Sequence, residues 1–280
     1  MLPAVLVAFS LGCGASVLLH MREVKRSDTL RLFLGGGSNS LALSTADGVF
    51  LTDAKFGNFT REMQAQLKVS LGQRVSRLLL THSHSDHAGG LPQFAGTPVV
   101  IVHPNTRQRL EAQGSPKAPW MEVAKELNLW LDGEEVWIGY LGRGHTDGDL
   151  VAYLPREKLL VAGDLYLQGF APIFDPSAGG SALEFEATAA RMLALDFEEI
   201  LPGHGELATR ADFERFHRYL QQLKAQVSQG IAAGETEDAV AARVTLDEFA
   251  DYGSLLGLSS REKNVRQMYR DLQEAARKRP

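Results

Sequence analysis

The sequence predicts a layered α/β or α+β fold that ends in a helical extension. Short apolar runs alternate with amphipathic segments from Leu30 to about residue 206, a pattern typical of stacked sheets and helices. After Leu207 the hydrophobic spacing is almost wholly helical. Hydrophobic residues make up 44% and charged residues 22% of the 280 residues, as in ordinary folded proteins. We therefore expect one catalytic domain at residues 21–206 and a C-terminal helical extension, residues 207–280, packed on it.

The individual elements follow from local periodicity and turn residues. Strands are expected where short apolar runs meet glycine, aspartate or proline, and helices where apolar residues recur every three to four positions. The expected strands are 30–34, 40–45, 49–56, 75–81, 98–103, 134–141, 150–155, 158–165 and 198–205. The expected helices are 58–73, 88–94 (a start only), 104–113, 181–195, 211–228, 235–244 and 260–278.

Residues 1–20 differ from the rest of the chain. No charged residue occurs from Leu2 to Leu19, and basic residues follow at 22, 25 and 26. A secretory signal, a membrane anchor and a buried first strand all fit this pattern. "SLGC" resembles a bacterial lipoprotein box in which Cys13 carries the lipid. We expect a protein of a bacterial-type cell envelope, periplasmic or attached to the membrane through this segment. A misplaced start codon or a core strand would instead indicate a cytoplasmic protein.

Charge and cysteine content exclude several classes of partner and site. The net charge of −5 and the pI near 5.9 argue against binding of nucleic acid through a basic face. The single cysteine, Cys13, excludes an internal disulfide framework and a cysteine-rich zinc site. Any metal in this protein must therefore be held by histidine and carboxylate. The oligomeric state stays open.

The stretch "LLLTHSHSDHAGGL" contains the strongest chemical signal. Side chains of an extended segment alternate between two faces, so His82 and His84 point the same way and can share one ion. Asp86 continues this phase, whereas His87 breaks it and is expected to face a second position close by. Four ligand-type residues within six positions, at the end of an apolar strand, predict a metal site rather than a solvated loop.

Three further ligand-type residues occur in similar settings. His145 lies in "GRGHTDGD" between two strands, Asp164 ends the strand "LLVAGD", and His204 ends the strand "EILPGHG". Five imidazoles and two carboxylates would satisfy two Zn²⁺ ions and leave room for water. Iron or manganese would fit the same donors.

These motifs, in this order, resemble the metallo-β-lactamase-fold hydrolases, including their glyoxalase II-like branch. The resemblance runs from about Arg31 to Gly205 and implies a four-layer αββα sandwich. It assigns the first ion to His82, His84 and His145, the second ion to Asp86, His87 and His204, and the bridge between them to Asp164. Asp53 matches the early strand-end aspartate of the family, which is usually a structural or ligand-supporting residue.

Two ions of this kind can share a hydroxide that attacks an acyl or phosphoryl centre. We therefore expect a zinc-dependent hydrolase of a small molecule with an ester-like bond, namely a thioester, lactone, lactam or phosphoester. Asp86 and Asp164 are the candidate catalytic residues, and Tyr166 is a candidate substrate contact whose alternative is a buried position in its strand. Thr146, Asp147 and Asp149 are candidates for supporting His145 or for a simple turn.

The sequence departs from several named branches of the family, which narrows the activities that the resemblance implies. Asp164 stands where the commonest β-lactamase subclass has cysteine. "LYLQGFAPIFD" replaces the Gly-Cys-Gly-Arg stretch typical of glyoxalase II and persulfide dioxygenases, and His84 replaces the glutamate of diiron oxidoreductases. The alternatives are an iron-dependent oxidoreductase on the same fold and a β-lactamase-like enzyme. Tryptophans 120, 130 and 137 are expected in the core or lining an apolar groove, and His103 and His217 are expected to be structural.

Overall fold

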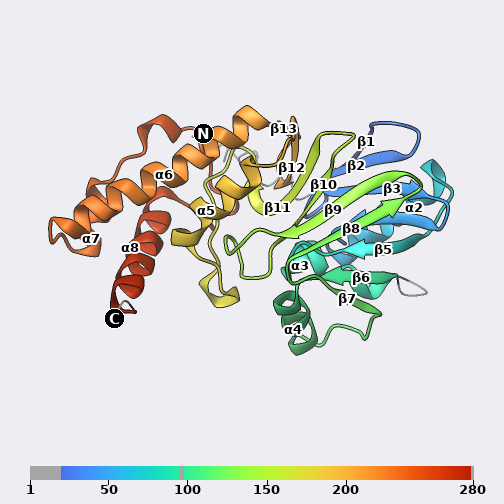
Figure 1. The fold of residues 1–280 in the computed structure, drawn as a ribbon, viewed down its shortest axis with the longest axis horizontal. Helices are drawn as coiled ribbons and strands as arrows, with labels where there is room; N and C mark the ends of the chain where they lie inside the picture. Colours follow the sequence, from blue (N-terminus) through green and yellow to red (C-terminus); the bar gives the residue numbers. More distant parts are fainter. Residues whose placement is uncertain (1–19, 95–97, 279–280) are drawn as a thin grey trace, which may run out of the picture.

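Two β-sheets lie face to face, and helices cover the outer side of each sheet (Figure 1). The computed structural model describes residues 20–94 and 98–278. The first sheet has seven strands in chain order: β1 (Met21–Lys25), β2 (Leu30–Gly35), β3 (Ser40–Thr45), β4 (Gly48–Thr52), β5 (Val75–Leu79), β6 (Val99–Val102) and β7 (Trp120–Glu122). The second sheet has six strands, in the order β13 (Ala208–Thr209), β12 (Glu199–His204), β11 (Leu159–Leu167), β10 (Leu150–Leu154), β9 (Glu134–Tyr140) and β8 (Glu126–Leu131).

The helices are segregated by sheet. In the described residues they are α2 (Gly57–Ser70), α3 (Ser85–Ala88), α4 (Pro104–Ala112), α5 (Ala182–Leu193), α6 (Arg210–Ala232), α7 (Glu237–Arg243) and α8 (Arg261–Arg277), with short 3-10 turns at η1 (Leu91–Gln93), η2 (Pro176–Ala178) and η3 (Asp247–Phe249). In Figure 1 the C-terminal helices α5 to α8 gather at one end, beside the second sheet. The predicted αββα sandwich with C-terminal helices is confirmed.

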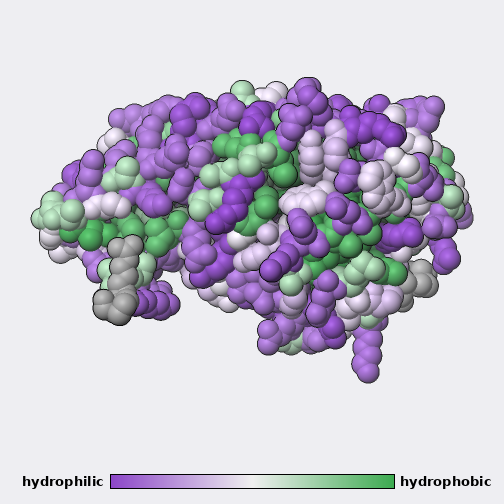
Figure 2. Space-filling model, in the orientation of Figure 1, coloured by the Kyte–Doolittle hydropathy of each residue, from purple (hydrophilic) through white to green (hydrophobic). Residues whose placement is uncertain are grey.

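Three hydrophobic layers hold the sandwich together. Between the sheets, alternate side chains of both inner faces interdigitate, for example Leu32 and Phe50 with Ile138 and Leu201, all fully buried. Met63 of α2 packs on the outer face of the first sheet. Burial of one such side chain stabilises the fold by about 1.5–3 kcal/mol. Hydrophilic residues cover most of the face seen in Figure 2, as expected when the apolar side chains are enclosed between layers.

The helix α6 attaches the C-terminal region to the second sheet. Its N-terminus is closed by a reciprocal capping box between Thr209 and Asp212. Phe213, Phe216 and Leu220 recur at helical spacing and are buried against the same core as α5 and α8. Since β13 belongs to the second sheet, the helical region begins at Arg210 rather than directly at residue 207.

Several sequence expectations about elements were incomplete or wrong. Strands β1, β7, β8 and β13 were not predicted. β1, β7 and β13 are short or carry few apolar residues, whereas β8 (ELNLWL) was missed although four of its six residues are apolar. The helix expected to start at 88–94 is the short α3 followed by η1, since Gly89 and Gly90 interrupt it and Pro92 lies in the next turn. Trp130 does not fill the core, because it is 68% exposed on β8.

The predicted leader, residues 1–20, lies almost wholly outside the described residues. In the part of the chain that the structure describes, no helix has the length and apolar character required to cross a membrane.

Candidate metal centre

The ends of parallel strands bring the predicted ligands together. Strands β4 and β5 of the first sheet run parallel, and Asp53 and the segment that begins at Thr81 follow directly at their carboxyl ends. In the second sheet β11 and β12 run parallel, and His204 is the last residue of β12. Asp164 was expected to end its strand but lies within β11, at a register irregularity that follows Gly163. A backbone hydrogen bond from Leu150 N to Thr81 O, 2.9 Å long, joins the two sheets beside the site. The sandwich therefore places both sets of strand ends at one edge.

All seven predicted ligands meet there in two groups. The donor atoms within each group lie within 4.8 Å of one another. The first group is His82, His84, His145 and Asp164, and the second is Asp86, His87 and His204. The imidazoles of residues 82, 84 and 145 thus lie together, as do the side chains of residues 86, 87 and 204, and Asp164 falls in the first group.

The carboxylate of Asp164 faces both groups. Its Oδ1 lies 3.1 Å from Nε2 of His87 and 3.4 Å from Nε2 of His204, whereas its Oδ2 lies 3.5 Å from Nε2 of His145. On the other side of the second group, Oδ2 of Asp86 lies 3.1 Å from Nε2 of His204. One buried carboxylate therefore spans the space between two clusters of imidazole nitrogens.

The donor set fits divalent metal ions. Nε2 of His82, Nε2 of His87 and Oδ1 of Asp164 are buried atoms with no hydrogen-bond partner among the described residues. Such orphaned polar atoms are costly unless another group satisfies them. Imidazole nitrogens and carboxylate oxygens that point at one another are the arrangement that a zinc-type ion satisfies.

Buried hydrogen bonds fix which nitrogen of each imidazole faces the cluster. Nδ1 of His87 lies 2.8 Å from Oδ2 of Asp53, and Nδ1 of His145 lies 2.9 Å from the carbonyl oxygen of Ile173. Both acceptors require a proton on Nδ1, which leaves the lone pair on Nε2 for a metal. Nδ1 of His82 similarly contacts Oγ1 of Thr81 at 3.1 Å. The supporting role predicted for Asp53 is consistent with this contact.

His84 faces the cluster with its other ring nitrogen, Nδ1. Its Nε2 lies 2.8 Å from Oδ2 of Asp175, so its Nδ1 faces the cluster, 2.9 Å from Nε2 of His145. Asp175 was not singled out from the sequence, although it ends the stretch "LYLQGFAPIFD". An aspartate before a proline is an ordinary turn residue, so only the folded position reveals its contact with His84.

Burial and charge divide the imidazoles electrostatically. Burial, together with the neighbouring imidazoles, places the pKa of His82 well below its usual value, which favours the neutral form that binds metal. Burial alone would lower the pKa of His204, but Asp164 and Asp86 raise that pKa to about 9. Burial likewise would raise the pKa of Asp86, yet His87 and His204 lower it to about 2. The second group therefore combines one ionised carboxylate, that of Asp86, with imidazoles that hold protons until a cation replaces them.

Glycines permit the close approach of the strand ends. A Cβ on Gly203 would lie 1.9 Å from Oδ1 of Asp164, and a Cβ on Gly163 would lie 2.7 Å from the side chain of Thr81. Any larger residue at either position would displace these side chains. Access from solvent is at the other side, where the side chains of His84 and Asp86 are 31% and 20% exposed.

Comparison with known proteins supports this geometry. A sequence model of the metallo-beta-lactamase superfamily matches residues 34–204, more than half of the chain. The chain belongs to this superfamily. It is similar to the metallo-beta-lactamase type 2 of Bacillus sp. (strain 170), with 25% identity over 62% of this chain and 68% of the relative. It is also similar to the 2,4-dinitroanisole O-demethylase subunit alpha of Nocardioides sp. (strain JS1661), with 25% identity over 77% of this chain and 64% of the relative.

Solved structures share the fold of this superfamily member. A metallo-beta-lactamase from Pontibacter korlensis superposes with a TM-score of 0.64 at 22% identity, covering 72% of this chain and 99% of its own. The sec-alkylsulfatase Pisa1 from Pseudomonas sp. superposes with a TM-score of 0.75 at 14% identity, covering 89% of this chain and 50% of its own. As a member of this superfamily the protein is a metal-dependent hydrolase.

The remaining candidate residues of this metallo-hydrolase have structural positions. Tyr166 is 2% exposed, packs edge-on against Phe213 and Phe216, and donates its hydroxyl to Gln168. The sequence-based assignment of Tyr166 as a substrate contact is therefore replaced by its alternative, a buried position, because the α6 core encloses the ring. His103 caps α4 by accepting from Asn105 N.

The residues beside His145 shape its loop rather than contact its imidazole. Asp149 accepts from the backbone nitrogen of Thr146 at 2.7 Å and from its hydroxyl at 2.6 Å. Asp147 forms a two-point ion pair with Arg109 of α4, at 2.6 and 2.9 Å. His217, on α6, pairs with Glu186 at 3.2 Å.

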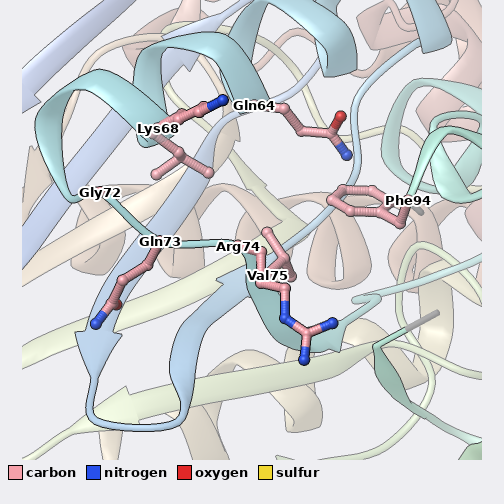
Figure 3. Close-up of a pocket in the computed structure, with 8 residues that line it drawn as sticks. Gln64, Lys68, Gly72, Gln73, Arg74, Val75 and Phe94 are labelled. Atoms are coloured by element: carbon pink, nitrogen blue, oxygen red, sulfur yellow. The ribbon is translucent and has the colours of Figure 1, made fainter. Parts of the chain in front are cut away.

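A surface pocket of about 480 Å³ lies apart from this chemistry (Figure 3). Its walls come from α2, the turn that follows it, the start of β5 and Phe94, which follows η1. They include Gln64, Lys68, Arg74 and Phe94, and none of the seven clustered residues. We therefore assign the chemistry to the cluster at the strand ends and not to this pocket.

Proposed function

We propose that this protein is a zinc-dependent hydrolase with a two-ion centre that cleaves an ester-like bond in a small molecule. The observation that carries the proposal is the carboxylate of Asp164, whose two oxygens face the two groups of imidazoles. When bound, two divalent ions supply an activated water and a Lewis acid that polarises an acyl or phosphoryl oxygen.

The residues of the chain divide the work. His82, His84 and His145 would hold one ion, Asp86, His87 and His204 the other, and Asp164 would contact both. Asp86 is the partly exposed carboxylate of the second group, and in this proposal it would also orient the attacking water. Because the cluster contains a full set of metal donors, no serine or cysteine nucleophile is required.

The substrate class includes thioesters, lactones, lactams and phosphoesters. Lactams are included because relatives are named metallo-beta-lactamases, although Asp164 replaces the cysteine of the commonest subclass. The O-demethylase relative adds a methyl aryl ether as a further candidate. An iron-dependent oxidoreductase on the same fold is the alternative from another reaction class.

The decisive experiment combines metal analysis with a substrate panel. Protein purified without added metal would be analysed for zinc, iron and manganese, then stripped with a chelator and reloaded with each metal. We expect about two zinc ions per chain, loss of turnover on chelation and recovery with zinc. The panel would contain nitrocefin, a thioester, a lactone, a phosphodiester and a methyl aryl ether. Iron as the native metal, with oxygen uptake during turnover, would favour the oxidoreductase and contradict this proposal.

We also propose that the protein resides in the cell envelope. The uncharged segment 2–19 and the basic residues that follow it support this location. Fractionation of a native host should place the protein in the periplasm or membrane. A Cys13→Ser variant would abolish lipid attachment at this residue. It would leave the location unchanged if the segment is instead a cleaved signal or a retained anchor. A full-length product in the cytoplasmic fraction would contradict the proposal.

A further inference from the structure

Lys55 is a buried cation without a carboxylate hydrogen-bond partner in the described structure. It follows β4, has a left-handed backbone (φ 59°) and is 0% exposed. Its Nζ donates to three carbonyl oxygens, those of Phe33 at 3.2 Å, Gly35 at 2.7 Å and Ser38. A lysine ammonium has three donors, so the set is complete. A buried charge and a strained backbone at one position are costly, and such features concentrate at functional sites.

The turn that Lys55 holds, residues 35–39, contacts two segments of the second metal group. The hydroxyl of Ser38 donates to the carbonyl oxygen of Asp86 at 2.8 Å. The backbone nitrogen of Asn39 donates to the carbonyl oxygen of Gly203 at 2.8 Å. The side-chain nitrogen Nδ2 of Asn39 donates to the carbonyl oxygen of Gly205 at 2.9 Å. The turn therefore touches the backbone at Asp86 and on both sides of His204.

The backbone around Lys55 contacts the third member of that group. Ala54 N donates to the carbonyl oxygen of His87 at 2.6 Å, and Gly90 N donates to the carbonyl oxygen of Lys55 at 2.8 Å. By contrast, the imidazoles of the first group bond to Thr81, Ile173 and Asp175, none of which contacts the Lys55 ammonium. The segments of all three members of the second group therefore hydrogen-bond to the turn 35–39 or to the backbone next to Lys55. The imidazoles of the first group bond to other residues.

We propose that Lys55 is a positioning residue that sets the affinity for the second metal ion by fixing the turn 35–39 between the Asp86 and His204 segments. The inference rests on the two-ion centre proposed above. Gly35, Gly36 and Gly37 all have positive φ, so the turn has little conformational preference of its own and requires an external tie. Three carbonyl oxygens converging on one ammonium provide that tie. Burial lowers the pKa of Lys55 to about 7, and the nearby Asp53 opposes this change.

The test compares Lys55→Met with wild-type protein and with Lys68→Met, an exposed lysine of α2 that serves as the matched control. Methionine keeps a long unbranched side chain but removes the three donors. Metal-free proteins would be titrated with zinc against a chromophoric chelator, with bound metal counted by elemental analysis. We expect two ions in wild type and control, and in Lys55→Met a second-ion affinity at least about 10-fold weaker, with first-ion affinity unchanged. Excess zinc should restore the activity of Lys55→Met, a rescue that general loss of structure would not show.

A second variant keeps the inference testable should Lys55→Met fail to fold. Ser38→Ala leaves the ammonium and its acceptors in place and removes only the bond to Asp86; it should also weaken the second ion selectively. Equal weakening of both ions in a folded variant, or wild-type affinity for both, would overturn the role of Lys55. Selective weakening of the first ion would also overturn the role of Lys55. A single ion in wild-type protein would instead overturn the two-ion centre, and this inference with it.

Discussion

Nδ1 of His87 lies 2.8 Å from Oδ2 of Asp53, and both side chains are buried. The other oxygen of Asp53 accepts from the backbone nitrogen of Thr81 at 2.8 Å. The carboxylate therefore links the end of β4 to the residue that precedes the histidine cluster, and it determines that His87 presents Nε2 to the second group.

Replacing Asp53 by asparagine should weaken metal binding. The asparagine oxygen would remain on Thr81 N, so its NH₂ group would face Nδ1 of His87 and place the proton of His87 on Nε2. We expect second-ion affinity to fall about 10–100-fold, measured by chelator competition. Asp47→Asn, an isosteric change at an exposed ion pair, is the control and should leave affinity unchanged. Wild-type affinity in Asp53→Asn would contradict this role.

Replacing Asp175 by asparagine should act on the first ion instead. Oδ1 of Asp175 accepts from the backbone nitrogens of Ser177 and Ala178, so the new NH₂ group would face Nε2 of His84 and put the proton on its metal-facing Nδ1. We expect first-ion affinity to fall about 10–100-fold, with a smaller effect in Ser177→Ala. The prediction fails if metal titration shows the second ion to be the weakened one.

Asp164→Asn tests the carboxylate that faces both groups. The amide keeps the size of the side chain but cannot offer an anionic oxygen to each group. We expect loss of at least one ion by elemental analysis and a fall in turnover of more than about 100-fold, beyond the range for residues that only orient a ligand. Thermal denaturation of the metal-free variant would confirm that it folds. Full metal content with full activity would exclude a bridging role.

Zinc affinity should rise with pH. In the metal-free protein the pKa of His204 is raised to about 9, so below that pH its imidazole holds a proton that zinc must displace. Asp86, with a pKa lowered to about 2, stays ionised throughout this range and adds no pH dependence. Burial alone would lower the pKa of His87, but Asp164, Asp53 and Asp86 raise it well above its usual value, so His87 also holds a proton that zinc must displace. We expect second-ion affinity to increase from pH 6 through about 9. Calorimetric titration in buffers of different ionisation enthalpy should detect the released proton; no proton release at pH 7 would contradict the assignment.

Sequence pattern predicted the ligand cluster well because its information is local. Alternation along an extended segment placed His82 and His84 on one side. Ligand-type residues next to glycine, in a loop or at an expected strand end, identified His145, Asp164 and His204. Apolar periodicity predicted a layered α/β or α+β core, and the four-layer sandwich was implied by the resemblance of the motifs to the metallo-β-lactamase fold. Strands β1 and β7 were missed because they are short and their side chains are polar or partly exposed, so no apolar run distinguishes them. Strand β8 was missed although its sequence, ELNLWL, is mostly apolar.

The sequence by itself determined the donor types, their order along the chain and the layered fold, because ligand chemistry and strand or helix periodicity depend on neighbouring residues. Tertiary structure alone decided which side chain supports which imidazole. Asp175 meets His84 across 91 positions of sequence, and Lys55 reaches carbonyl oxygens that belong to another strand and turn. It also placed Tyr166 in the core. Such contacts depend on how loops pack over the strands, and this packing cannot be predicted from the pattern of neighbouring residues.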